Sequence, residues 1–332
     1  MKHIPFRAYW VTEEPDGSFK HQIKERNTND LPQNGVLIKV LYSSLNYKDA
    51  LSATGNKGIT RKYPFTPGID AVGLVVESSS ELFQEGDEVI VTGYDLGMNT
   101  MGGFGEYINV PAEWIVPLPR GMTPMESMTL GTAGFTAALM LYHLIRFGQQ
   151  AETGDLLVTG ATGGVGSLAV AMAAKLGFNV VAATGKTDKE NYLINLGAKQ
   201  VIDRSEVDDN SGRLLMRARW AAAIDTVGGN TLTTILKTLQ VHGNVVCCGN
   251  VASSMLQTSV FPFILNGVNL LGVNTSTTPM PLRLTIWDKM TNDWRPDFNK
   301  IETKPVALED LHNQIELILK GQVTGRVVVK MR

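Results

Sequence analysis

The 332-residue sequence is poor in cysteine, in net charge and in long apolar runs. Its two cysteines, Cys247 and Cys248, are adjacent, and adjacent cysteines rarely bridge and cannot make a metal site alone. The formal net charge of −2 argues against a nucleic acid as the main partner. No run approaches the roughly 18 apolar residues of a membrane helix, and the first residues do not open a signal peptide. These absences predict a reduced, soluble, cytoplasmic protein.

What the sequence does contain is a glycine-rich stretch flanked by two apolar runs, residues 155–185. Residues 156–158 are apolar and predict a buried strand, and residues 179–183 predict a second one. Between them, residues 168–176 keep a helical apolar face that Gly177 ends. The stretch is therefore predicted to be one βαβ unit with a glycine-rich turn.

The chemistry of that turn is anion binding. Glycines let a pyrophosphate approach the backbone without a Cβ in the way, and the N-terminus of the following helix favours negative charge. The position between a strand and a helix makes a ligand-free glycine turn the weaker interpretation. The predicted pyrophosphate contacts are Gly160, Thr162, Gly163, Gly164, Val165 and Gly166.

The rest of the chain divides into three parts. Residues 1–123 carry short β-type runs separated by glycine turns, which is typical of a partly open barrel. Residues 124–275 alternate strand and helix patterns, which predicts an α/β doubly wound parallel sheet. Residues 276–332 are predicted to return and largely complete the first part. We expect the ligand in the cleft between the two domains.

Five segments carry a resemblance to a known family: residues 43–50, 67–73, 131–137, 160–166 and 261–265. With them the chain resembles the zinc-free medium-chain dehydrogenase/reductases, in their quinone-oxidoreductase-like branch and closest to the acryloyl-CoA reductase group (YhdH/YhfP type). The resemblance spans the whole chain. It implies a GroES-like catalytic domain, a Rossmann domain, and NADPH-dependent reduction of an activated carbon–carbon double bond, often by a dimer.

Two sequence positions distinguish the zinc-dependent members of this superfamily from the zinc-free ones. Zinc alcohol dehydrogenases carry a cysteine where this chain has Asn46 and a histidine where it has Ile69. Neither replacement is a good zinc ligand, so no metal is predicted. Without a Lewis acid to polarise an alcohol or carbonyl oxygen, reduction of an alkene that is already polarised is favoured over alcohol oxidation.

The end of the second strand indicates which cofactor is bound. NAD-binding folds place a carboxylate there for the ribose 2′-hydroxyl, whereas this chain reads Ala183, Thr184, Gly185 and Lys186. Thr184 and Lys186 suit a 2′-phosphate, and Arg204 matches a phosphate-binding arginine of the resembled group. NADPH is the predicted cofactor; surface charges without a ligand are the alternative for Lys186 and Arg204.

The resemblance implies further contacts around the nicotinamide. Tyr47 would touch the cofactor, and its hydroxyl could also donate a proton or bind the substrate carbonyl. Asn46 could donate a hydrogen bond to the thioester oxygen, or merely cap a turn. Asp49 is expected to cap the following helix. The other implied cofactor contacts are Thr132, Thr136, Gly249, Asn250, Phe263, Ile264, Asn274 and Thr275.

These residues predict a reductase of acryloyl-CoA. An NADPH:quinone oxidoreductase is the alternative enzyme, and an NADPH-binding protein that recognises RNA is the alternative outside enzymes. The loop with Lys57, Arg61 and Lys62 could meet the phosphates of coenzyme A or be a solvated loop. Residues 268–273 are apolar on both faces and predict a homodimer that pairs this edge strand across a two-fold axis.

Overall fold

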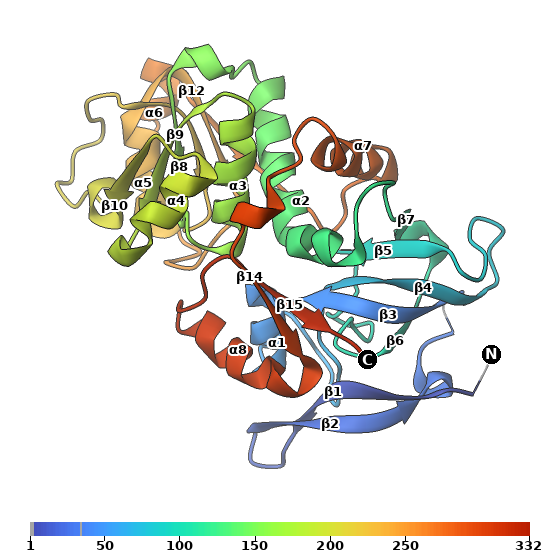
Figure 1. Cartoon of the computed structure of the whole chain (residues 1–332). Coiled ribbons are helices and arrows are strands. Elements are labelled where there is room, and N and C mark those ends of the chain that lie inside the picture. The colour runs from blue at the N-terminus through green and yellow to red at the C-terminus, as the bar shows by residue number, and fades with distance from the viewer. Residues whose placement is uncertain (1–2, 34) are drawn as a thin grey trace. The chain divides into compact units, whose positions relative to one another are not determined.

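A computed structural model describes residues 3–33 and 35–332 of the chain. The chain divides into two compact units (Figure 1). The first unit holds residues 1–132, 276–285 and 302–332, and the second holds residues 133–275 and 286–301. Residues 124–132 therefore lie with the first unit and residues 286–301 with the second, unlike the predicted limits.

A parallel sheet forms the centre of the second unit. Its strand order is β10-β9-β8-β11-β12-β13, so the order reverses between β8 and β11, as in a Rossmann fold. Right-handed crossovers then place the helices of the two halves on opposite faces. The elements are β8 (Asp155–Val158), α3 (Gly164–Lys175), β9 (Asn179–Thr184), α4 (Glu190–Leu196), β10 (Gln200–Asp203), β11 (Trp220–Asp225), α5 (Gly229–Thr238), β12 (Leu239–Cys247), α6 (Phe261–Asn266) and β13 (Asn269–Gly272).

A seven-stranded sheet forms most of the first unit. Its order is β14-β15-β3-β4-β5-β7, with β6 paired to β3, so the C-terminal strands complete a sheet that the N-terminal part begins. The hairpin of β1 and β2 packs beside it through bridges from Ala8 and Val11. The elements are β1 (Pro5–Glu13), β2 (Phe19–Asn27), β3 (Val36–Ser44), α1 (Tyr47–Ala53), β4 (Asp70–Ser78), β5 (Glu88–Thr92), β6 (Tyr107–Val110), β7 (Ile115–Pro117), β14 (Thr303–Ala307), α8 (Leu311–Leu319) and β15 (Arg326–Lys330).

Two helices cross the division, α2 (Pro124–Arg146) and α7 (Met280–Thr291). Gly131 interrupts α2 with φ +49° and ψ −152°. By length and composition α2 could cross a membrane, which the sequence analysis overlooked. However, 78% of its most apolar window is buried inside the protein, as in a core helix. The α7 residues Trp287 and Met290 are buried in the core of the second unit.

Candidate functional site

The glycine turn, residues 160–166, follows β8 and runs into the first turn of α3, so it connects the strand and the helix as predicted. Gly160 has φ +58°, and a Cβ there would lie 2.3 Å from the Thr226 hydroxyl. A Cβ on Gly166 would lie 2.3 Å from the carbonyl oxygen of Gly160, so this glycine lets the helix pack on the turn. Gly163 is the N-cap of α3 and has no side chain to cap the helix, so it leaves the N-terminal N–H groups uncovered. This backbone fits the pyrophosphate of a dinucleotide.

Residues predicted for the 2′-phosphate come together at the carboxyl ends of β9 and β10. The hydroxyl of Thr184 lies 3.2 Å from that of Thr162 and accepts the N–H of Lys186 at 3.1 Å. Thr184 of β9 pairs with Asp203 of β10, so Arg204, the next residue, lies beside the end of β9. A Cβ on Gly185 would lie 2.8 Å from Cδ of Arg204, which means that the arginine side chain crosses this glycine. The exposed guanidinium has no ion pair among the described residues, so these residues fit a ribose phosphate.

The remaining predicted cofactor contacts of the second unit differ in their surroundings. A Cβ on Gly249 would lie 1.8 Å from the carbonyl oxygen of Thr226, beside the glycine turn. Both Phe263 and Ile264 belong to α6. Phe263 packs against the hydrophobic core of the second unit, and Ile264 is 67% exposed. Neither observation places a cofactor against them, so their contacts stay predictions. The same holds for Thr136, which is buried in α2, and for Asn250, Asn274 and Thr275.

In the first unit, Asn46 is held between two buried carboxylates. Its Nδ2 donates to Oδ2 of Asp70 at 2.8 Å and to Oδ2 of Asp49 at 3.2 Å. Asp49 also accepts the backbone N–H of Asn46 and that of Ile69, both at 2.8 Å, and so caps α1 as expected. The amide donors of Asn46 are therefore used within the protein. A hydrogen bond to a thioester oxygen would have to displace one of these contacts.

Three further residues close this arrangement around Asp70. Its carboxylate accepts the hydroxyls of Ser44 at 2.5 Å and Thr132 at 2.6 Å, and the Thr132 N–H at 3.0 Å. Arg326 donates to Oδ1 of Asn46 at 3.3 Å and to the carbonyl oxygen of Thr129 at 2.9 Å. We call Ser44, Asn46, Asp49, Asp70, Thr132 and Arg326 the polar cluster. Four separate segments of the first unit supply it.

Burial governs the charges of the polar cluster. Asp49 and Asp70 are fully buried, and Arg326 is 3% exposed. Burial, and next the charge of Asp70, raise the pKa of Asp49 to about 7, so this carboxyl is about half ionised at neutral pH. Burial lowers the pKa of Arg326, and the two carboxylates oppose that shift. The guanidinium thus balances Asp49 and Asp70 inside the fold.

Asp70, Ser44 and Arg326 were missed as site residues. Asp70 lies in one of the five family-like segments, and Arg326 directly precedes three apolar residues, where an arginine needs partners. Either charge in an apolar run could have drawn attention to the cluster. Tyr47, the first residue of α1, is 36% exposed, and its hydroxyl has no partner among the described residues. This leaves the phenol open to a ligand, and its role stays a prediction.

The same residues do not fit a catalytic zinc. Zinc alcohol dehydrogenases carry a ligand at each of two positions; at one of them the Asn46 amide faces two carboxylates and a guanidinium, and at the other Ile69 offers only hydrocarbon. Within residues 3–33 and 35–332, no group of three or more His, Cys, Asp or Glu side chains could hold a metal ion.

Two family models match separate parts of the chain. Residues 32–120 match the alcohol dehydrogenase GroES-like domain, and residues 164–290 match the zinc-binding dehydrogenase family. YhfP of Bacillus subtilis, which carries a quinone oxidoreductase name, is 44% identical over 98% of this chain and 99% of its own. The acrylyl-CoA reductase AcuI of Ruegeria pomeroyi is 41% identical over 96% of each chain.

Solved structures agree with these matches. The crystal structure of YhfP with NAD bound has a TM-score of 0.95 at 43% identity, covering 99% of this chain and 100% of that one. YhdH of Escherichia coli K-12 with bound NADPH has a TM-score of 0.94 at 39% identity, covering 98% and 100%. The protein is therefore an oxidoreductase that belongs to the medium-chain dehydrogenase/reductases, in the quinone-oxidoreductase-like group.

Proposed function

We propose that the protein reduces the carbon–carbon double bond of acryloyl-CoA to give propanoyl-CoA, with NADPH and without a metal. The observation that carries the proposal is the donor set at the zinc position. An amide bound to two carboxylates, beside a hydrocarbon side chain, offers no Lewis acid for an alcohol or carbonyl oxygen. An alkene conjugated to a thioester needs none, because the carbonyl already polarises it. The name of the Ruegeria relative supports this substrate class.

The 2′-phosphate residues favour NADPH over NADH. The exposed Arg204 guanidinium crosses Gly185, close to Thr184 and Lys186, and the end of β9 carries no carboxylate that would repel a phosphate. One relative of known structure holds NAD and another holds NADPH. These residues support NADPH for this chain. The cofactor, when bound, supplies a hydride for the β-carbon of the substrate.

The polar cluster has a positioning role in this proposal. It fixes Asn46 through both ends of its amide, and Asn46 immediately precedes α1. The first turn of α1, which carries Tyr47, is thereby held in one orientation. Thr132 is likewise held, since both its N–H and its hydroxyl donate to Asp70. The cluster therefore contributes rigidity to the reacting centre.

Tyr47 has the free hydroxyl of this region. It can position the cofactor ribose, bind the thioester carbonyl, or donate the proton that the α-carbon receives. We favour positioning, since water can protonate an enolate. Asn46 is the weaker candidate for stabilising negative charge on the thioester oxygen, because its donors already face carboxylates.

The loop before β4 supplies cations for a coenzyme A carrier. The Lys57 Nζ forms an ion pair with Oε2 of Glu13 at 2.5 Å and lies over the ring of Tyr63. Arg61 and Lys62 are exposed and have no ion pair among the described residues. They are therefore the available cations, and Arg61→Ala with Lys62→Ala should raise KM for acryloyl-CoA more than for a thioester without the nucleotide.

A quinone reductase is the second candidate, because the relative YhfP carries that name at 44% identity. It would use the same fold and cofactor. A quinone has no nucleotide, so the Arg61 and Lys62 changes should leave its KM unaltered. This difference separates the two activities within one protein.

We propose a cytoplasmic homodimer. In the described sheet β13 is one of the two edge strands, and the neighbouring α6 exposes Phe261, Ile264 and Leu265 to solvent at 39%, 67% and 61%. An apolar edge of this kind is typical of a surface that a second copy covers. Light scattering should give a dimer at micromolar concentration, and Leu271→Lys should dissociate it. A monomeric parent protein would contradict the proposal.

The experiment that tests the reaction follows the hydride. With NADPH deuterated at C4 on the transferred face, propanoyl-CoA should carry one deuterium at the β-carbon. In D₂O with unlabelled NADPH, the label should enter the α-carbon instead. Oxidation of NADPH without a labelled product, or reduction of a quinone alone, would refute the proposal.

A further inference from the structure

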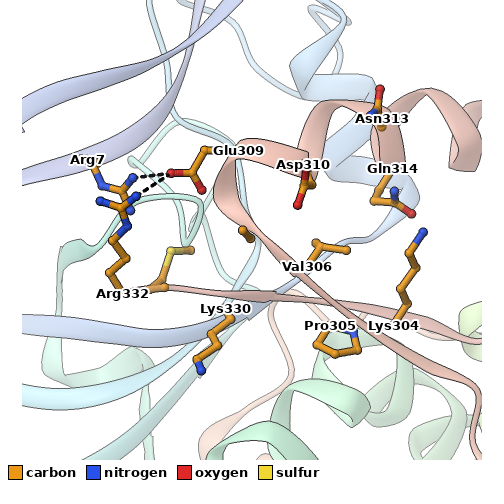
Figure 2. A pocket seen from close by; sticks show the side chains of 12 residues that line it. Arg7, Lys304, Pro305, Val306, Glu309, Asp310, Asn313, Gln314, Lys330 and Arg332 are labelled. Carbon is orange, nitrogen blue, oxygen red and sulfur yellow. Dashed lines mark hydrogen bonds and ion pairs between the residues drawn. The ribbon is translucent and has the colours of Figure 1, made fainter.

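A charged groove lies in the first unit and shares no lining residue with the polar cluster. It has a volume of about 870 Å³, within the range of small-molecule sites. Its lining comes from β1, β14, β15 and α8, and all of these elements belong to the first unit (Figure 2). None of the residues predicted from the sequence or found in the polar cluster takes part.

The charges of the groove fall into two groups. Arg7 and Arg332 both pair with Glu309, and Arg7 pairs also with Glu106. Figure 2 shows these arginines and Glu309 together at one end. Asp310, Lys304 and Lys330 are exposed and have no ion pair among the described residues. One end is thus neutralised, and the other presents charges that the protein does not satisfy.

Gln314 is the residue that points to a ligand. Its side chain is only 6% exposed, it lines the groove, and its carboxamide has no hydrogen-bond partner among the described residues. The amide atoms are not among the fully buried polar atoms that lack a partner, so they open onto the groove and need a hydrogen-bond partner there. A water molecule can bond to the amide, but the groove is large enough for a small organic ligand and has further charged groups around the amide.

Three residues place complementary chemistry around this amide. Asp310 is the N-cap of α8, has right-handed helical backbone angles and precedes Gln314 by four residues, so the two side chains lie on the same side of the helix. Lys304 and Val306 share one face of β14, and Val306 packs in the core with Leu311 and Ile315 of α8. That face of β14 is therefore turned toward α8. The arrangement offers an ammonium and an amide, a carboxylate, and the hydrocarbon of Val306.

We propose that this groove binds a small carboxylate with a neighbouring hydrogen-bond donor and a short hydrocarbon chain, an α-amino or α-hydroxy acid. Lys304 and Gln314 hold the ligand carboxylate. Asp310 accepts from its ammonium or hydroxyl, and the hydrocarbon chain lies over Val306. The proposal is independent of the reductase activity, because it uses none of the same residues.

The test uses three probes that share one hydrocarbon chain: leucine, 2-hydroxyisocaproate and isocaproate. Each is titrated calorimetrically into the full protein with NADPH present in excess, so that anion sites for the nucleotide are filled. We expect leucine or 2-hydroxyisocaproate to bind, and the probe of the two that binds identifies the donor. Isocaproate should bind roughly tenfold more weakly, because it has no ammonium or hydroxyl that could donate a hydrogen bond to Asp310.

The variants locate the site. Lys304→Gln and Gln314→Leu should each weaken binding roughly tenfold or more, and Asp310→Asn should remove the preference over isocaproate. Lys304 is exposed, so its variant keeps the test valid if Gln314→Leu fails to fold. Lys320→Gln, an exposed lysine of the same region that pairs with Glu316, is the matched control. No binding of any probe at millimolar concentration, or equal binding by Lys304→Gln and the control, would overturn the proposal.

Discussion

The glycine turn of the second unit is built from backbone, whereas the polar cluster of the first unit is built from side chains. In the turn, the missing Cβ atoms of Gly160 and Gly166 make the site, and seven consecutive residues contain it. In the cluster, hydrogen bonds join Asn46 to Asp70, Asp49 and Arg326, across residues 44–49, 70, 132 and 326. A local backbone site can lose a neighbouring side chain and persist. A side-chain network fails when one charge is removed.

The largest effect should follow loss of the one cation in the polar cluster. Arg326→Met leaves Asp49 and Asp70 buried without a balancing charge, and should lower the free energy of unfolding by about 3–5 kcal/mol. Arg332→Met, at an arginine whose side chain is 75% exposed, should cost less than about 1 kcal/mol. Urea denaturation measures both. Equal costs would show that the cluster is no network.

The phosphate-binding residues should give the next effect. The parent protein should prefer NADPH over NADH by roughly 100-fold in kcat/KM, about 2.7 kcal/mol. Lys186→Ala with Arg204→Ala should remove most of that preference and leave turnover with NADH intact, because the backbone turn is untouched. Lys199→Ala, at an exposed lysine before β10, is the control. An unchanged ratio in the double variant would mean that other residues bind the phosphate.

The polar cluster should also show in the pH dependence of stability. The pKa of Asp49 is raised to about 7 from an ordinary 3.8, so the folded state holds a proton that the unfolded state releases. The stabilisation is complete below about 3.8 and is lost as pH rises through about 7, at up to about 1.4 kcal/mol per pH unit. Asp49→Asn should flatten this slope. An identical slope in parent and variant would assign the titration to another group.

Tyr47→Phe should change the kinetic constants least. It tests whether the helix turn that the polar cluster holds only positions ligands. If the hydroxyl only positions ligands, KM for NADPH or the thioester should rise a few-fold and kcat should change little. A general acid would instead lose roughly 100-fold in kcat, together with a solvent isotope effect. Steady-state kinetics in H₂O and D₂O distinguishes them. A variant identical to the parent in every constant would remove Tyr47 from the site.

The sequence was most informative where structure is local. The strand, turn and helix of residues 155–185 form where the apolar periods and glycines predict, because short-range sterics decide them. The structure gives a reason for the break of α2 at Gly131, which is not a local one. A Cβ there would lie 2.6 Å from Asp70 and from Ser44.

The polar cluster was not predictable in the same way. Asn46, Tyr47 and Thr132 were singled out by resemblance, but the partners that hold Asn46 lie 24 and 280 residues away. Such contacts depend on how β3, β4 and β15 pair, and no local pattern encodes that pairing. For the same reason, the direction of the Asn46 amide could not be foreseen, and it changes the role that we give this residue.

The most direct test of the account is the choice of acceptor. Purified protein with excess NADPH is given acryloyl-CoA, crotonoyl-CoA and a soluble quinone in parallel, with and without a chelator. We predict turnover of acryloyl-CoA at a kcat/KM of about 10⁴ M⁻¹s⁻¹ or more, unaffected by the chelator, and far slower reduction of the quinone. Turnover of the quinone alone, or activity that the chelator removes and zinc restores, would contradict the account.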